Sequence, residues 1–407
     1  MRRVVITGMG IVSCLGYRLE DVAKALFEGR PGITFVEEYA RRGIRSCVAG
    51  IPKFDAEIKI DRRLRRYMSD AALYAYHATR SAIADAGLSR EALASSRTGL
   101  IVGSGTGSPC ELVEAIENYK SRGAAKVLPY EIPRIMGSTT SANLVTAFGI
   151  RGISYSITSA CATSAHSIGH GAELIQFGKQ DRVIVGGAEE VSWISTLLFD
   201  AMNALSTGFN DRPQSASRPY DRQRDGFVIA GGAGILVLEE LDSALARGAH
   251  IHGELIGYAA TSDGGDMVTP DPDGAARAMR QAIEQGGETV DYINSHATST
   301  RIGDVVELEA IRQVFGNRIP LISSTKGLTG HPIAAAGAHE AIYCMLMLRH
   351  GFITGCANMD EPDEATEGFP LVGASRHASL NTILSNSFGF GGTNASLVLR
   401  RWHATAP

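Results

Sequence analysis

Short apolar runs alternate with longer amphipathic stretches along the whole chain. The apolar runs at 99–103 and 183–187 predict strands buried on both faces, and residues 3–6 predict a strand that enters a glycine turn. Residues 69–87 have helical spacing, with Ser69 placed to cap the N-terminus. Strands that alternate with helices are typical of α/β proteins with buried sheets.

The two halves of the chain repeat one order of elements. In the first half, a helix of small residues at 165–177 precedes a glycine-rich turn with an aromatic residue at 227–232 and a last strand at 235–238. In the second half, the same elements lie at 334–348, 388–392 and 397–399. No flexible linker separates these parts. We therefore predict two similar halves, 1–245 and 246–407, in one continuous core. Residues 106–133 have a looser pattern, which we interpret as an insertion or cap in the first half.

Composition narrows the class of protein. The chain has 407 residues, enough for a large core, and a net charge of −4, which disfavours a general nucleic-acid binder. Its six cysteines form no CxxC pair or metal-ligand cluster, as expected in a reducing compartment. We find no signal peptide and no apolar run long enough to cross a membrane, so we expect a cytoplasmic protein that binds neither membrane nor nucleic acid.

Cys161 lies where the alternating run at 153–157 gives way to the helical pattern at 165–177. A cysteine at a helix N-terminus lies at the positive end of the helix dipole, which favours the thiolate. We therefore predict a reactive thiol at this junction. A small, inert core cysteine is the alternative, because free cysteines are frequently buried.

Two of the eleven histidines follow strand-like runs, in turns rich in Gly, Ser and Thr. His296 follows the run at 290–294, and His331 ends a segment that begins with Ser-Thr-Lys326. Functional groups in α/β sheets gather at strand C-termini. Either histidine alone is as readily structural, but together with Cys161 they predict one site built from both halves.

Four motifs resemble those of the β-ketoacyl-acyl carrier protein synthases of the thiolase-like superfamily. They are Ser-Ala-Cys-Ala-Thr-Ser-Ala-His at 159–166, the segment 294–300 with Gly303, Asp304 and Glu307, the Ser-Thr-Lys to Gly-His segment at 324–331, and Asn-Ser-Phe-Gly-Phe-Gly-Gly-Thr-Asn at 386–394. The resemblance covers nearly the whole chain, and 224–232 looks most like the synthase I subtype of bacterial type II fatty-acid synthesis. It implies a thiolase-like fold, with two α/β halves packed as a five-layer α-β-α-β-α core.

The resemblance also implies a transferase reaction, the decarboxylative Claisen condensation of an acyl thioester with a malonyl thioester. Acyl carrier protein carries both on its 4′-phosphopantetheine arm, so no cofactor and no metal are expected on the enzyme itself. By resemblance, Cys161 is the acyl acceptor, and His296 and His331 donate hydrogen bonds to the enolate. Lys326 pairs with Glu307 and tunes the electrostatic field at the cysteine, and the N–H groups of Cys161 and Phe390 form the oxyanion hole. Phe390 is also the gate of the acyl tunnel, Glu307 and Phe227 support the site, and Thr298 and Thr300 bind the pantetheine arm.

The densest basic cluster consists of Arg62, Arg63, Arg65 and Arg66. Acyl carrier proteins are strongly acidic, so the resemblance makes this cluster a docking candidate, which Arg122 and Lys126 would extend. A solvated helix face is the alternative. The family also implies a homodimer that pairs through 153–157.

Three residues depart from the family pattern, namely Ala297, Pro332 and Ala334. They leave the catalytic groups in place, and we expect them to affect chain-length preference more than activity. The competing interpretations are a synthase II-type enzyme, a polyketide ketosynthase and a non-catalytic chain-length factor, and the presence of Cys161 argues against the last.

Overall fold

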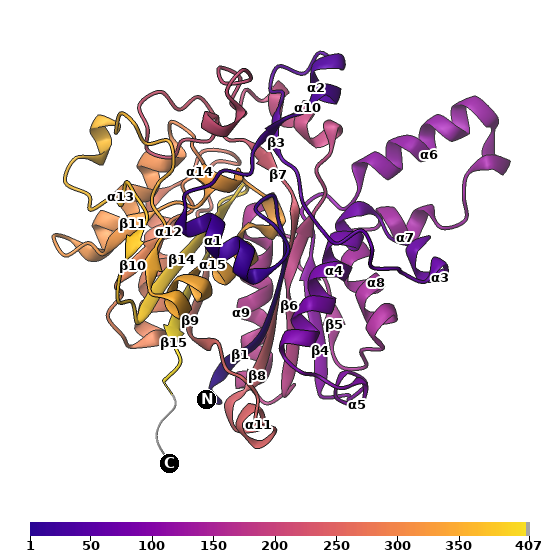
Figure 1. The fold of residues 1–407 in the computed structure, drawn as a ribbon, viewed down its shortest axis with the longest axis horizontal. Helices are drawn as coiled ribbons and strands as arrows, with labels where there is room; N and C mark the ends of the chain where they lie inside the picture. The colour runs from indigo at the N-terminus through magenta and orange to yellow at the C-terminus, as the bar shows by residue number, and fades with distance from the viewer. Residues whose placement is uncertain (404–407) are drawn as a thin grey trace.

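A ten-stranded mixed sheet runs through the molecule (Figure 1). The structure, a computed structural model, describes residues 1–403. In spatial order the strands are β11 (Leu321–Ser323), β10 (Tyr292–Asn294), β14 (Thr382–Gly389), β15 (Thr393–Arg401), β9 (Gly253–Ser262), β1 (Val4–Val12), β8 (Gly232–Glu240), β6 (Arg182–Glu189), β4 (Thr98–Gly103) and β5 (Ser154–Tyr155).

The sheet consists of two halves with the same topology. Their first strands, β1 and β9, pair antiparallel at the centre. Each of them pairs on its outer side with the last strand of its own half, which is antiparallel to it. The next strand outward is antiparallel to that one, and the two outermost strands are each parallel to their inner neighbour. The strands of the two halves have the same order and direction, which indicates a duplicated unit. The first copy ends at β8 and the second begins at β9. The exact limits of two domains stay a prediction.

Helices form the other layers of the core. The central layer is α9 (Thr163–Gln176) and α15 (Ala336–His350), which pack on each other. Helix α9 lies mainly on strands of the first half, and α15 contacts strands of both halves. Helix α15 is buried from Ala336 to Leu348, as expected of a helix covered on all sides. The outer layers are α4 (Asp70–Asp85) with α8 (Thr139–Phe148), and α12 (Pro272–Gly286) with α13 (Gly303–Phe315) (Figure 1). The α-β-α-β-α order confirms the predicted fold.

The helix predicted at 69–87 is confirmed as α4, and the Ser69 hydroxyl accepts a hydrogen bond from the N–H of Ala72. The glycine turn predicted after Ile6 is wrong, because β1 continues through Gly8 and Gly10. A Cβ on Gly8 would lie 2.3 Å from the carbonyl oxygen of Ala82, and one on Gly10 would lie 2.0 Å from that of Ala78. These glycines therefore allow α4 to pack closely on the strand; they do not turn the chain.

Residues 106–133, which we interpreted as an insertion or cap, are mostly helical. Helices α6 (Pro109–Arg122) and α7 (Glu131–Ile135) form an arm that projects from the first half (Figure 1). The arm exposes large apolar side chains such as Ile116, Tyr119 and Ile132. None of the arm's residues lines the cavity that contains Cys161.

The remaining elements are short. The helices are α1 (Leu19–Phe27), α2 (Glu37–Arg41), α3 (Arg62–Arg65), α5 (Arg90–Leu93), α10 (Trp193–Ala201), α11 (Leu241–Ala246) and α14 (Lys326–Thr329), and the strands are β2 (Thr34–Phe35), β3 (Val48–Gly50), β7 (Ile229–Ala230), β12 (Phe352–Ile353) and β13 (Arg376–His377). Within residues 1–403, no helix combines the length and apolar character needed to span a bilayer.

Candidate active site

Cys161 lies in a tight 3₁₀ turn, Ala160–Ala162, directly before α9. Ala160 has a left-handed φ of +48°, a conformation that costs energy in a residue with a Cβ. The second half repeats this turn before α15, where Ile333 has a φ of +45°. Ala334 then occupies the position that corresponds to Cys161, so of these two turns only the first carries a cysteine.

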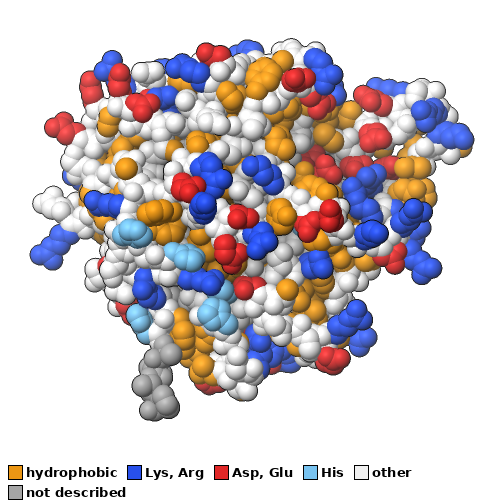
Figure 2. All heavy atoms as spheres, in the orientation of Figure 1, with side chains coloured by type: hydrophobic (Ala, Val, Ile, Leu, Met, Phe, Trp, Pro, Cys, Tyr) orange, Lys and Arg blue, Asp and Glu red, His pale blue; other side chains and the backbone are white. Residues whose placement is uncertain are grey.

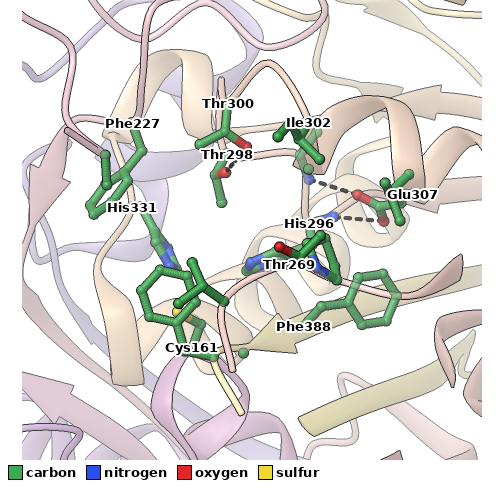
Figure 3. A pocket seen from close by; sticks show the side chains of 18 of the residues that line it. Cys161, Phe227, Thr269, His296, Thr298, Thr300, Ile302, Glu307, His331 and Phe388 are labelled. Carbon is green, nitrogen blue, oxygen red and sulfur yellow. Dashed lines mark hydrogen bonds between the residues drawn. The ribbon is translucent and has the colours of Figure 1, made fainter. Parts of the chain in front are cut away.

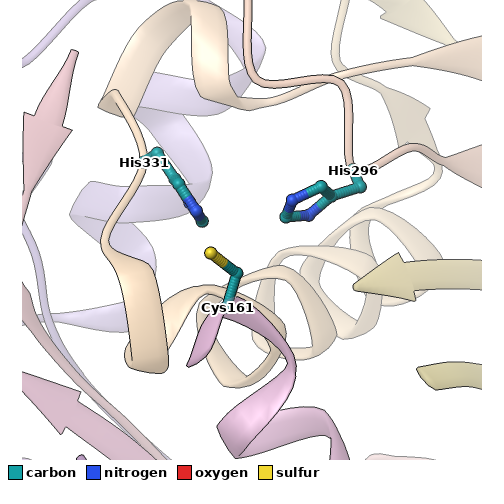
Figure 4. Close-up of side chains that lie close together, drawn as sticks. All are labelled: Cys161, His296 and His331. Carbon is teal, nitrogen blue, oxygen red and sulfur yellow. The ribbon is translucent and has the colours of Figure 1, made fainter. Parts of the chain in front are cut away.

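Three predicted residues from both halves converge. The sulfur of Cys161 and a ring nitrogen of each of His296 and His331 all lie within 4.8 Å of one another (Figure 4). His296 follows β10, and His331 follows the short helix α14 that comes after β11. Both rings point toward the sulfur, so the three side chains form one cluster, as predicted from the sequence.

The thiol of Cys161 is protonated at rest. Burial raises its pKa to about 12, although the charge of Lys326 and the backbone N–H groups of Phe390 and Cys161 act in the opposite direction. The backbone N–H groups at the helix N-terminus favour the thiolate, as expected from the sequence, but burial outweighs this effect on the pKa. The two N–H groups do face the sulfur, where an oxyanion would form during attack on a thioester.

Both histidines are neutral. Burial and the nearby charge of Lys326 lower the pKa of His331 well below its usual value, and His331 adds to the same effect on His296. Neither ring nitrogen of His331 has a hydrogen-bond partner in residues 1–403, and the same is true of Nδ1 of His296. The two rings can therefore serve an incoming ligand as neutral N–H donors.

The predicted pair between Lys326 and Glu307 is wrong. The Lys326 ammonium, which is 1% exposed, pairs with the Glu340 carboxylate on α15. Glu307 instead accepts hydrogen bonds from the backbone N–H groups of His296 at 2.9 Å and Ala297 at 2.8 Å, and so fixes the His296 loop (Figure 3). Sequence analysis missed Glu340, although a carboxylate inside the apolar run at 334–348 was a signal.

A cavity of about 400 Å³ opens over the reaction centre. Thr298 and Thr300 lie across it from Cys161, with their hydroxyl oxygens 3.2 Å apart (Figure 3). The Phe227 ring packs edge-on against His331 at 5.6 Å between centroids, and Phe390 lies at the rim, 37% exposed. Every predicted site residue outside the arginine cluster is thus at the cavity or next to it.

The glycine-rich turn is tied to a second loop that sequence analysis did not single out. The N–H of Gly391 donates to the carbonyl oxygen of Met267 at 2.8 Å, and the Asn394 amide donates to Asp263 at 2.6 Å. Residues 263–271 thereby close one side of the cavity. Their Gly, Asp and Pro content signals a loop but not its position.

The departure at Ala297 is accommodated by the backbone. Ala297 is not among the residues with a positive φ, and its side chain is buried. Its N–H is held by Glu307. The added Cβ therefore strains neither the loop nor the position of His296.

The arginine cluster lies away from the cavity. It forms the short helix α3, beside α7, where the rings of Tyr67 and Tyr130 are 6.1 Å apart. Figure 2 shows Lys and Arg side chains gathered on this side of the molecule, with acidic side chains among them. Arg65 donates to the carbonyl oxygen of Met68 at 2.7 Å, and Arg66 lies over the ring of Tyr67, so the exposed Arg62 and Arg63 are the least engaged.

Cys161, His296 and His331 also have the chemistry of metal ligands. The buried Lys326 ammonium lowers the pKa of both histidines, which shows that its positive potential reaches this centre. The same potential opposes a second cation there. The donor set therefore fits hydrogen bonding to a substrate anion better than it fits metal binding.

Comparison with known proteins agrees with this geometry. Residues 1–244 match the N-terminal domain of beta-ketoacyl synthase, and residues 252–360 match its C-terminal domain. The chain is 54% identical over 403 residues to 3-oxoacyl-[acyl-carrier-protein] synthase 1 of Escherichia coli strain K12, covering 98% of this chain and 99% of that protein.

Two solved structures extend the likeness. A beta-ketoacyl synthase from Burkholderia phymatum superposes with a TM-score of 0.94 at 36% identity, over 99% of this chain and 100% of that one. A type II polyketide ketosynthase, solved with its acyl-carrier protein and a bound hexaketide, superposes with a TM-score of 0.91 at 27% identity, over 98% and 100%. Because the matches cover nearly the whole chain and the fold is shared, the chain belongs to the β-ketoacyl synthase family.

Proposed function

We propose that this protein is a 3-oxoacyl-[acyl-carrier-protein] synthase of type I that elongates fatty acids. It transfers an acyl chain to Cys161, decarboxylates malonyl-carrier protein, and joins the two. The overall products are 3-oxoacyl-carrier protein, carbon dioxide and free carrier protein. The observation that carries the proposal is the approach of Cys161, His296 and His331 to within 4.8 Å of one another.

The first half-reaction takes place at Cys161. Its sulfur attacks the acyl thioester, the bond to the pantetheine sulfur breaks, and the cysteine proton ends on the released pantetheine thiol. The N–H groups of Cys161 and Phe390 stabilise the oxyanion, and the loss of one such donor costs about 10²–10³ in rate. The ammonium of Lys326 favours the transient thiolate, in line with its effect on the pKa of Cys161.

The second half-reaction takes place beneath the two histidines. As malonyl thioester loses carbon dioxide, negative charge develops on its carbonyl oxygen, and His296 and His331 donate hydrogen bonds to that oxygen. The carbanion attacks the acyl-cysteine, a carbon–carbon bond forms, and the Cys161 thiolate leaves and takes up a proton. Neutral donors suffice, because decarboxylation itself produces the nucleophile.

The remaining residues bind and shape the substrates. Thr298 and Thr300 hydrogen-bond the pantetheine arm, while Phe227 and Phe390 bound the acyl path, with Phe390 as its gate. Acyl carrier protein is the partner, supported by the solved relative that holds one, and it docks on the cluster of Arg62, Arg63, Arg65 and Arg66.

We further propose a cytoplasmic homodimer. Within residues 1–403, strand β5 has a sheet neighbour, β4, on one side only, and its residues Ser154 and Tyr155 are exposed. An unpaired edge strand invites pairing with another chain. The apolar side chains exposed on the arm supply further surface that a second copy would bury.

Replacement of Cys161 by Gln tests the proposed division of roles. The variant lacks the nucleophile, so it should form no acyl-enzyme and no 3-oxoacyl product, but it should still release carbon dioxide from malonyl-carrier protein. His296→Ala should lose the decarboxylation. If C161Q cannot decarboxylate while it stays folded, the proposed roles are wrong.

A further inference from the structure

Among the described residues that line the cavity, Arg301 is the single Lys or Arg. It directly follows Thr300 and is exposed, whereas Cys161 lies at the floor of the same cavity. The cavity therefore has a reactive thiol at its inner end, two hydroxyls along one wall, and a cation at its solvent end.

The backbone that carries Arg301 is held rigidly. The buried carboxylate of Asp304 accepts from the N–H groups of Ser299 at 3.1 Å and Thr300 at 3.2 Å. The buried guanidinium of Arg224 donates to the carbonyl oxygens of Thr300 at 3.0 Å and Arg301 at 2.8 Å. This order is present without substrate, so a ligand bound by Arg301 does not have to organise the loop.

The charge of Arg301 is available to a ligand. Its Nε donates to the carbonyl oxygen of Arg224 at 3.2 Å, which orients the guanidinium. In residues 1–403 the Arg301 guanidinium forms no salt bridge: no carboxylate oxygen lies within 4.0 Å of its nitrogens. A guanidinium that keeps free donors at a cavity mouth suits a phosphate, which it can bind with two parallel hydrogen bonds.

The acidic residues at the same rim are already engaged with protein donors. Asp225 accepts from the backbone N–H groups of Thr207 at 2.9 Å and Gly208 at 2.8 Å. Asp263 accepts from Asn394, and Asp271 caps α12 by accepting from the N–H of Asp273 at 2.9 Å. These contacts hold the three carboxylates on donors other than Arg301, so its guanidinium stays available to a phosphate.

We propose that Arg301 binds the phosphate of the 4′-phosphopantetheine arm. This inference rests on the proposed function, and it adds a charged contact to the arm beyond Thr298 and Thr300. Along the arm the thiol comes first, then the amides, then the phosphate. The cavity offers matching groups in the same order: Cys161, the two threonine hydroxyls, and Arg301.

The test measures how well arm analogues protect Cys161 from alkylation by iodoacetamide, which needs no turnover. The two probes are S-ethyl thioethers of 4′-phosphopantetheine and of pantetheine, which have no free thiol and differ only in the phosphate. In the wild type, the phosphorylated probe should give half-protection at a lower concentration. Arg301→Gln should raise that concentration about three- to tenfold, leave the pantetheine probe unchanged, and remove most of the preference.

Two controls sharpen the result. Arg301→Lys keeps the charge and should retain most of the preference, and Arg318→Gln removes an exposed arginine that does not line the cavity and should change nothing. A wild type without preference for the phosphorylated probe, or an equal loss for both probes in R301Q, would overturn the assignment. Failure of the proposed function would appear separately, as a wild type that forms no acyl-cysteine from acyl-carrier protein.

Discussion

The rings of His296 and His331 meet edge to face, with centroids 5.2 Å apart and 86° between their planes. Their pKa values are both lowered well below the usual value, first by burial and then by the charge of Lys326. An acid–base pair would need one charged and one neutral ring. Two neutral rings that face one thiol instead form a pair of hydrogen-bond donors.

Removal of either donor should slow decarboxylation. We expect His296→Ala and His331→Ala each to lower the rate of carbon dioxide release from malonyl-carrier protein by about 10²–10³. Formation of the acyl-enzyme at Cys161, followed by intact-protein mass spectrometry, should be less affected. His350→Ala, an exposed histidine outside the cavity, is the control. Normal decarboxylation in both cavity variants would contradict the donor role.

The lowered histidine pKa values predict a flat pH profile for decarboxylation. A histidine whose folded pKa lies well below 6.5 is already neutral at pH 6.5 and does not change its charge up to pH 8. Carbon dioxide release by C161Q, which has no thiol to titrate, should therefore be nearly constant from about pH 6.5 to 8. A rate that falls as pH rises across this window would mean that a charged histidine is required.

The raised pKa of Cys161 makes an opposite prediction for alkylation. Since burial raises this pKa to about 12, the thiolate fraction should grow about tenfold for each pH unit from pH 7 to 10. The iodoacetamide rate, measured by mass spectrometry on the folded protein, should rise without levelling, whereas a free cysteine levels off above about pH 8.5. A plateau near pH 7 would show that the helix N-terminus outweighs burial.

Sequence analysis predicted that Cys161, His296 and His331 share one site because each has a local signal, and the structure brings the three together. Cys161, His296 and His331 each follow a strand-like run, and the duplicated fold brings the ends of those strands to one place. The helix at 69–87 was likewise predictable from its own spacing and its Ser69 cap. The helix cap and the strand–turn patterns depend on residues that are close in sequence, so one amino-acid sequence is enough to predict them.

What sequence analysis missed depends on contacts between distant segments. Lys326 pairs with Glu340 because the fold brings the two buried side chains together. The carboxylate inside the apolar run at 334–348 signalled a buried partner, but not which cation it would meet. Gly8 was predicted to turn the chain because glycine is a local turn signal. Its role in the structure, the close approach of α4, depends on residues far along the chain. For Cys161 the sequence displayed the helix N-terminus but not the burial, which raises the pKa of the thiol and exists only in the folded chain.

Charge reversal on α3 should weaken carrier-protein binding. Arg63→Glu with Arg66→Glu should raise KM for acyl-carrier protein several-fold more than KM for an acyl-pantetheine, and added salt should reduce the difference, because the contacts are exposed. The double variant Arg90→Glu with Arg318→Glu makes the same change in net charge at exposed positions elsewhere. Equal effects in the two double variants would remove α3 from the docking surface.

The Lys326–Glu340 pair should control both stability and thiol reactivity, and the two effects can be separated. Glu340→Gln leaves a buried ammonium without its partner, which costs about 3–5 kcal/mol, whereas the exposed Glu309→Gln should change little. Urea unfolding measures both. Lys326→Met with Glu340→Leu removes both charges and should recover most of that stability, because no unpaired charge is left in the core.

That recovered double variant then isolates the effect of charge on Cys161. The Lys326 ammonium lowers the pKa of the thiol, so its removal should raise that pKa and slow alkylation at every pH below it, in a protein of near wild-type stability. The pKa values of the two histidines should rise in the same direction, since loss of the cation makes the rings easier to protonate. An alkylation rate that matches the wild type would show that Lys326 serves the fold alone, not the field around the thiol.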